Sequence, residues 1–102
     1  MFQSHKFFIY CILIFFMDIN QLINVIKKKI ENNIVVTELQ IEDKSFLHKK
    51  HQSFNPKKFH IKIKIKTEDF KNLSKIEATR KIYSFLQYEL KNYIHSLEIL
   101  FI

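Results

Sequence analysis

Glycine and tryptophan are absent from the 102-residue sequence, and proline and cysteine occur once each. Without glycine, the chain cannot form the glycine-rich phosphate loops of nucleotide-binding enzymes or the GxxG loop that clamps a nucleic-acid backbone. The single cysteine, Cys11, excludes an intrachain disulfide framework and a cysteine-rich zinc site. The length suits one globular domain. These absences argue against a nucleotide-dependent enzyme.

Acidic residues are missing from one stretch of the chain. The 17 basic and 10 acidic residues give a net charge of +7. Residues 44–66 contain eight lysines and no acidic residue, so elsewhere nine basic residues face ten acidic ones. The positive charge is therefore local, which matters more for partners than the total does. Two interpretations stay open: an anion-binding surface, or a solvated face in a chain rich in lysine and isoleucine.

The longest apolar run lies near the N-terminus. It comprises residues 7–17, too few for a membrane-spanning helix, which needs about 20. No small-residue cleavage site of a signal peptide follows it. Met17 stands directly before Asp18, a residue type that caps helices. We therefore expect Met17 to be the true start, with residues 1–16 a leader outside the native protein and residues 17–102 the domain. No stable membrane insertion is expected; a membrane-associating anchor is the alternative.

Residues 18–30 predict an amphipathic helix. Their apolar residues recur at the i, i+3, i+4, i+7 spacing of a helix with one buried face. Asp18 is the expected N-cap, and Gln21 stands at the capping-box position. The asparagines of residues 31–33 predict a stop in the left-handed conformation that glycine usually supplies. The apolar stripe comprises Ile19, Leu22, Ile23, Ile26 and Ile30.

Three segments predict β-strands. Residues 34–42 are rich in β-branched side chains, and residues 59–66 alternate strictly between apolar and polar. We expect one face of residues 59–66 to be core and the other to be cationic and solvated. Residues 94–102 alternate as well, with His95 on the same face as the odd-numbered apolar residues. Residues 43–58 form a long polar loop, and loops of that length are usually functional or mobile.

Helical signals occupy the chain between the second and third predicted strands. Residues 67–73 predict a short helical turn that packs Phe70 into the core. Ser74 is the expected N-cap of the main helix, with Glu77 at its capping-box position, and the apolar stripe extends to Asn92. The order of elements predicts an α+β fold, with a three-stranded sheet and helices packed on one face.

Few residues offer catalytic or metal chemistry. No spacing indicates a catalytic triad and no HExxH motif occurs, so we expect no enzymatic activity. His48 and His51 lie three residues apart in the long loop, where two imidazoles can ligate borderline metals. The alternative is that both are solvent-exposed polar residues. Lys49 and Lys50 disfavour a bare divalent cation, but they are less unfavourable toward an anionic, thiolate-bearing cluster supplied mainly by a partner.

A nucleic-acid surface is a second possibility. His60, Lys62, Lys64 and Lys66 share one face of the predicted strand and, with the loop lysines, form a candidate phosphate-contacting patch. No arginine lies in residues 44–66, which excludes bidentate readout of guanine there. The sequence therefore predicts weakly specific binding that falls with added salt.

Four motifs, in order and with matching spacing, resemble the BolA family over about residues 18–101. The clearest is RKIYSFLQYEL at residues 80–90, which is similar to the family's Arg-x-x-x-Tyr/His-x-x-Leu-x-x-Glu-Leu helix. IHSL at residues 94–97 resembles the family's Val/Ile-His-Ala-Leu strand. HIKI at residues 60–63 is similar to Ser-His-Phe-x-Val, and DKSFLH at residues 43–48 is similar to the loop opening Glu-Ser-His-x-His.

The resemblance implies a class II KH-like fold, α-β-β-α-α-β, which lacks the GxxG clamp and so tolerates the absence of glycine. It implies a non-enzymatic, cytoplasmic protein that pairs with a monothiol glutaredoxin in iron–sulfur cluster handling or iron regulation, sharing a [2Fe–2S] cluster. Some bacterial members are described as DNA-binding regulators of stress response and morphology, so a KH-like DNA-binding transcription regulator is the alternative. A homodimer, and a relic fold without function, stay open as well.

The family's ligand positions are only partly present. His48 matches the second loop histidine, whereas the first falls on Phe46. Arg80 matches the last arginine of the family's Arg-His-Arg triplet, whose histidine falls on Thr79, a residue that cannot replace an imidazole ligand. We expect cluster ligation by His48, with His51 as a substitute that the family pattern does not include. The residues expected to dock the partner are His60, Arg80 and His95.

Overall fold

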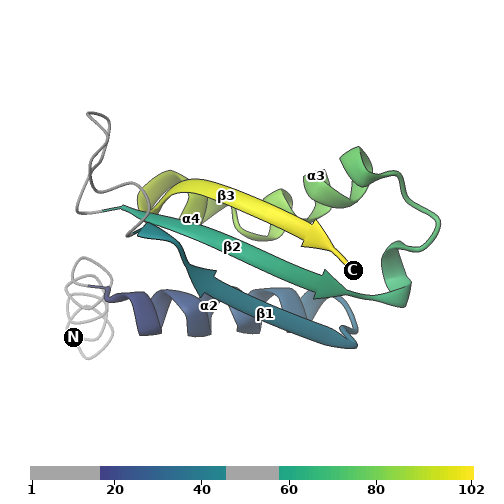
Figure 1. Cartoon of the computed structure of the whole chain (residues 1–102), viewed down its shortest axis with the longest axis horizontal. Helices are drawn as coiled ribbons and strands as arrows, with labels where there is room; N and C mark the ends of the chain where they lie inside the picture. The colour runs from purple at the N-terminus through teal and green to yellow at the C-terminus, as the bar shows by residue number, and fades with distance from the viewer. Residues whose placement is uncertain (1–16, 46–57) are drawn as a thin grey trace, which may run out of the picture.

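Helices cover one face of a three-stranded sheet (Figure 1), which confirms the predicted α+β class. The computed structural model describes residues 17–45 and 58–102; the expected leader, residues 1–16, lies outside them. In the described ranges no helix is long and apolar enough to cross a membrane. The sheet order is β1-β2-β3, with β1 antiparallel and β3 parallel to β2. The elements are α2 (Ile19–Asn33), β1 (Glu38–Asp43), β2 (Phe59–Lys66), the 3-10 turn η2 (Glu68–Phe70), α3 (Lys75–Phe85), α4 (Gln87–Asn92) and β3 (Ile94–Phe101).

Helix α2 begins with the predicted capping box. Asp18 Oδ1 accepts a hydrogen bond from the Gln21 N–H at 2.8 Å, and Gln21 Oε1 accepts one from the Asp18 N–H at 2.9 Å. These bonds satisfy backbone donors that have no partner inside the helix. Leu22, Ile26 and Ile30 are fully buried, as the apolar spacing predicts.

The predicted ending of α2 is wrong in its conformation. No described residue has a positive φ, and the C-cap, Ile34, is extended at φ −143°. The helix also continues to Asn33, whose side-chain Nδ2 donates to the Lys29 carbonyl at 2.6 Å. A β-branched residue that passes directly into extended chain ends the helix without a left-handed position.

The first strand is shorter than the predicted residues 34–42, because β1 begins only at Glu38. The Val35 N–H donates to Asp69 Oδ2 at 2.9 Å, and the Thr67 hydroxyl donates to the Val35 carbonyl at 2.6 Å. Both partners lie at η2. These side chains satisfy the backbone groups that a longer β1 would have paired within the sheet.

The predicted single helix over residues 74–92 is wrong, because it divides into α3 and α4 at Leu86. Ser74 is confirmed as the N-cap: its Oγ accepts from the Glu77 N–H at 3.1 Å. Leu86 leaves helical geometry at φ −113° and ψ 21°, yet it is fully buried. Apolar spacing continues through the break, so periodicity alone does not reveal it.

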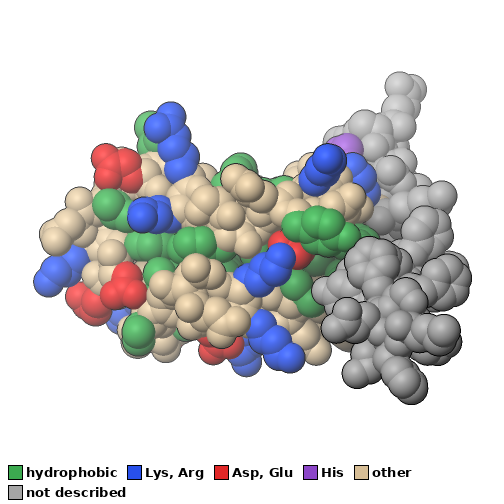
Figure 2. Space-filling view, turned by 180° about the vertical axis from the view of Figure 1, so that it is seen from behind, with side chains coloured by type: hydrophobic (Ala, Val, Ile, Leu, Met, Phe, Trp, Pro, Cys, Tyr) green, Lys and Arg blue, Asp and Glu red, His purple; other side chains and the backbone are tan. Residues whose placement is uncertain are grey.

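Strand β2 supplies the centre of the core. Ile61, Ile63 and Ile65 are at most 2% exposed, as the strict alternation predicts, and Phe70 of η2 is buried beside them in the same cluster. From the helix-bearing side, hydrophobic side chains form a band with Lys and Arg side chains above and below it (Figure 2). At roughly 1.5–3 kcal/mol for each large buried side chain, the β2 isoleucines anchor the sheet.

Candidate functional site

A β-bulge shapes the start of β3. Phe59 pairs with Ile94 and His60 pairs with Ser96, so His95 is an extra residue with no counterpart on β2. Bulges re-aim side chains and often lie beside functional sites. Here the bulge leaves Ile94 buried at 3% exposure while His95 and Ser96 are both exposed. The predicted strict alternation is therefore wrong at the first two residues of β3.

The bulge brings two histidines together. The ring centroids of His60 and His95 lie 4.9 Å apart, with the planes tilted by 49°. The expectation that His60 lies on the solvated face with the lysines is wrong: it is 5% exposed, because the His95 ring and Ser96 lie against it. Its Nδ1 shares a hydrogen bond with Ser96 Oγ at 2.7 Å. The His60 backbone N–H donates to Ser45 Oγ at 3.1 Å. The buried His60 ring, held by hydrogen bonds, thus packs against the exposed His95 ring. We call His60, His95, Ser96 and Ser45 the histidine cluster.

The histidine cluster lies where the segment of residues 46–57 joins the sheet. On one side of that segment the Lys44 N–H donates to the His60 carbonyl at 2.7 Å, and on the other the Phe59 N–H donates to the Tyr93 carbonyl at 2.8 Å. Both attachment points are therefore at the same end of β2. The predicted metal ligands His48 and His51 lie in that segment, outside the described residues.

The family's helix-histidine position lies at the other end of the sheet. Thr79, half-buried on α3, follows Ala78, which lines a hollow with Ile65 and Phe101 at the far ends of β2 and β3. Five residues of strand separate His60 from Ile65, a span of about 16 Å. The structure therefore brings His60 and His95 together but places Thr79 apart from them.

Arg80, the third predicted docking residue, is exposed on α3. It lines a shallow hollow with Tyr83 and Lys91 on the outer side of the helices. The Tyr83 hydroxyl donates to the Leu97 carbonyl at 3.3 Å, which ties α3 to the outer edge of β3. Arg80 thus belongs to a surface different from that of the histidine cluster.

Acidic residues on the neighbouring strands pair with two of the three β2 lysines, Lys62 and Lys64, whereas Lys66 is exposed and has no ion-pair partner among the described residues. Lys62 Nζ lies 3.9 Å from Glu98 Oε1, and Lys64 Nζ lies 3.9 Å from Glu42 Oε1. Lys44 Nζ approaches Glu42 Oε2 at 3.0 Å. Its hydrogen bond and charge, followed by the charges of Lys64 and Lys62, hold the pKa of Glu42 below its ordinary value. The open face of the sheet, which we define by Lys62, Lys64, Lys66 and these partners, therefore mixes both signs of charge.

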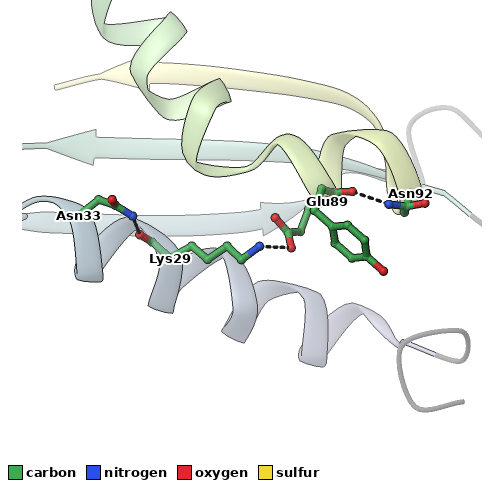
Figure 3. Close-up of polar contacts among 5 residues, drawn as sticks. Lys29, Asn33, Glu89 and Asn92 are labelled. Carbon is green, nitrogen blue, oxygen red and sulfur yellow. Dashed lines mark hydrogen bonds and ion pairs between the residues drawn. The ribbon is translucent and has the colours of Figure 1, made fainter. Parts of the chain in front are cut away.

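One ion pair between a buried carboxylate and a partly exposed lysine was not predicted. Glu89 on α4 is 2% exposed, and its Oε2 lies 2.6 Å from Lys29 Nζ on α2 (Figure 3). Among the described residues, no hydrogen bond reaches Glu89 Oε1. Lys29 Nζ also lies 5.7 Å from the centroid of the Tyr88 ring. The available signal was the position of Glu89, three residues after Leu86 on the buried stripe, where a carboxylate needs a partner.

Metal-ligating side chains do not gather in threes anywhere in residues 17–45 and 58–102. The histidine cluster holds two imidazoles, of which only that of His95 is exposed. Within these ranges, the chain can offer an external metal centre one accessible imidazole at this site. Any remaining ligands must come from elsewhere.

Comparison with known proteins gives consistent results. The family model described as BolA-like protein matches residues 30–101. The chain is 33% identical over 75 residues to the DNA-binding transcriptional regulator BolA of Haemophilus influenzae, covering 74% of this chain and 70% of that protein. It is 32% identical over 79 residues to SufE-like protein 1, chloroplastic/mitochondrial, of Arabidopsis thaliana, covering 72% of this chain but only 21% of that longer protein.

Solved structures agree with the sequence matches. The BolA domain of SufE1 from Arabidopsis thaliana aligns with a TM-score of 0.65 and 33% identity, over 74% of this chain and 84% of that one. BolA1 from the same plant aligns with a TM-score of 0.64 and 26% identity, over 74% and 83% of the two chains. With a family model that matches most of its length, a relative one-third identical and the same fold, this chain belongs to the BolA family.

Proposed function

We propose that this protein is a non-enzymatic, cytoplasmic partner of a monothiol glutaredoxin in iron–sulfur cluster handling or iron regulation. The observation that carries the proposal is the histidine cluster. A bulge sets His95 outward beside the buried His60, at the end of the sheet where the segment with His48 and His51 is attached. An exposed imidazole held by a rigid neighbour suits a ligand shared with another protein.

The cluster in this proposal is a cargo held between two proteins. Imidazole is a suitable ligand for iron, and His95 has the required exposure. His60 is buried and engaged with Ser96, so its role is to position the neighbouring ring. The partner's thiolates, together with His48 or His51, would complete the ligand set. Thr79 has no imidazole and lies toward the opposite end of the sheet, so the proposal assigns it no part.

The test mixes the full chain with a cluster-loaded monothiol glutaredoxin. Native mass spectrometry measures the heterodimer, and visible circular dichroism reports the ligand environment. We expect wild type to form the complex and change the spectrum, and His95→Ala to form the complex without that change. A wild-type chain that forms no complex at micromolar concentration would contradict the proposal.

Three further variants locate the ligands. Thr79→His adds an imidazole where the family has one, and we expect it to leave the spectrum of the complex unchanged. His48→Ala and His51→Ala, tested singly, should identify which loop histidine contributes. If Thr79→His changed the spectrum of the complex, and His48→Ala, His51→Ala and His95→Ala did not, the ligand site would lie on α3 instead. Far-ultraviolet circular dichroism of each variant alone controls for folding.

DNA binding is the second candidate function. The Haemophilus influenzae relative is named a DNA-binding transcriptional regulator, and this chain aligns with 70% of its length. The sequence alone points to Lys62, Lys64 and Lys66, two of which have acidic neighbours on the sheet. The corresponding test is the salt dependence of affinity for labelled duplex DNA, which must fall steeply if lysine and arginine contact phosphates.

A further inference from the structure

Unpaired cations lie along the outer side of α3 and α4. Arg80, Lys81 and Lys91 are all exposed, and none of them forms an ion pair with any residue in 17–45 or 58–102. Lys58 Nζ donates to the Lys91 carbonyl at 3.3 Å and so adds a fourth cation at this end. In the space-filling view, Lys and Arg side chains lie along the upper part, where α3 and α4 run (Figure 2).

Two shallow hollows join these cations into one surface. Both include Arg80 and Ser84, so they are continuous. The only acidic residue lining either hollow is Glu77. The remaining lining residues are Leu73 and Lys81 in one hollow, and Tyr83, Gln87, Leu90 and Lys91 in the other. We call this surface the helix groove.

The polar residues of the helix groove are spaced for an extended ligand. Arg80 and Ser84 lie four residues apart on α3, and Gln87 and Lys91 lie four residues apart on α4, so each pair shares one side of its own helix. Ser84 and Gln87 line the same hollow, so the break at Leu86 does not interrupt the row.

The side-chain types also favour phosphate. Arginine, lysine and glutamine side chains donate hydrogen bonds to nucleic-acid backbones, and the groove contains all three, whereas the Tyr83 and Ser84 hydroxyls already donate to the Leu97 and Lys81 carbonyls. On the open face of the sheet, a phosphate would compete with Glu42 and Glu98 for Lys62 and Lys64. In the helix groove the cations are available without that competition.

We propose that the helix groove binds the phosphate backbone of duplex DNA, without sequence readout, and that the lysines of β2 do not. The inference rests on the second candidate function, DNA binding, and assigns the DNA-binding surface to the helices instead of the sheet. A second protein with an acidic surface is the competing occupant, and the experiment below separates the two.

The experiment compares two variants that each lose three positive charges. Arg80→Gln/Lys81→Gln/Lys91→Gln alters the helix groove, and Lys62→Gln/Lys64→Gln/Lys66→Gln is the matched control on the sheet. Fluorescence anisotropy measures the affinity of the full chain for a labelled random duplex of about 20 base pairs. With three phosphate contacts, wild-type affinity should fall about 40-fold between about 50 and 200 mM salt.

The expected result is asymmetric. The groove variant should lose at least about tenfold in affinity and nearly all of the salt dependence, because each lost phosphate contact lowers the slope by about one. The sheet variant should lose less than about threefold. Unchanged far-ultraviolet circular dichroism and thermal midpoints show that both variants fold.

Each contrary outcome has a distinct meaning. A larger loss in the sheet variant overturns the groove while leaving DNA binding intact, and equal losses overturn it in favour of unspecific charge attraction. No binding by wild type at about 50 mM salt overturns both the groove and the DNA function. A polyglutamate peptide of equal charge that displaces DNA as well as unlabelled duplex does would assign the groove to an acidic protein.

Discussion

The open face of the sheet and the helix groove both carry positive side chains, but in different electrostatic settings. On the sheet, Lys62 lies beside Glu98 and Lys64 beside Glu42. In the groove, Arg80 and Lys91 have no ion-pair partner among the described residues. The sequence places eight lysines in residues 44–66, but strand pairing supplies acids from outside that window. Clustering along the chain therefore does not identify the free positive surface.

Tertiary pairing also decides what a lysine contributes. A lysine with a nearby carboxylate stabilises the fold, and its charge is partly neutralised toward a ligand. An unpaired lysine contributes little to stability, or repels its neighbours, and remains available to an anion. Stability measurements and binding measurements should therefore rank the two surfaces in opposite order.

The largest effect is expected where the carboxylate of an ion pair is buried. Lys29→Met removes the partner of the Glu89 carboxylate, which is 2% exposed, and should lower the free energy of unfolding by roughly 1–3 kcal/mol, less than for a fully buried pair because the Lys29 side chain is 39% exposed. Lys28→Met, an exposed position on the same helix, should change it by less than about 0.5 kcal/mol. Urea denaturation measures both. If both substitutions changed the free energy of unfolding equally, the contact of Lys29 with Glu89 would contribute nothing to stability.

A smaller loss is expected at the histidine cluster. Ser96→Ala removes the hydrogen bond to His60 Nδ1 and should lower the free energy of unfolding by about 1 kcal/mol. Ser84→Ala removes an exposed hydrogen bond, from the Ser84 hydroxyl to the Lys81 carbonyl one turn earlier, and should cost less than about 0.5 kcal/mol. If Ser96→Ala and Ser84→Ala lowered the free energy of unfolding equally, the hydrogen bond to His60 would not hold the histidine cluster in place, as the glutaredoxin proposal requires.

The two lysine surfaces should differ by a smaller margin. Lys62→Gln/Lys64→Gln should lower stability by less than about 1 kcal/mol at low salt, because two partly exposed ion pairs are lost. Arg80→Gln/Lys81→Gln should leave stability unchanged or raise it slightly. Repeating both measurements at about 0.5 M salt should remove the difference, since exposed charges are screened. A difference that persists at high salt would point to packing instead of charge.

The smallest effect is a pH dependence at Glu42. Lys44 lowers the pKa of this carboxyl below its ordinary value of 4.5, so the ionised form is favoured in the folded state. Its contribution to stability is complete above the unfolded-state pKa and is lost as pH falls through the lower folded-state pKa. Glu42→Gln should therefore flatten the acid limb of stability below pH 4.5, measured by thermal midpoint. If Glu42→Gln and wild type showed the same decrease in thermal midpoint at low pH, the ion pairs of Glu42 would contribute nothing to stability.

Local chemistry predicted much of the fold because it depends on neighbours in sequence. Asp18 and Gln21 form the expected capping box, Ser74 caps α3, and Phe70 is buried. The alternation of residues 59–66 correctly predicts the core face of β2 at Ile61, Ile63 and Ile65, but not the burial of His60. Each of these features depends on the spacing of side chains along one element, which is visible before the chain folds.

The candidate site was less predictable, because it depends on contacts between elements. The sequence identified His60 and His95, yet the bulge that puts their rings together comes from the pairing of β3 with β2. The break at Leu86 and the pair between Lys29 and Glu89 likewise become visible only when α4 packs beside α2. No single-element pattern contains this information.

By itself, the sequence determined the class of the fold, the core face of the central strand and the family. These follow from periodicity and from motifs that each lie within one segment. Only the tertiary structure decided which charges are paired and which histidines meet. The physical reason is range: caps and apolar faces act over three or four residues, whereas ion pairs such as Lys29 with Glu89 join residues 60 positions apart.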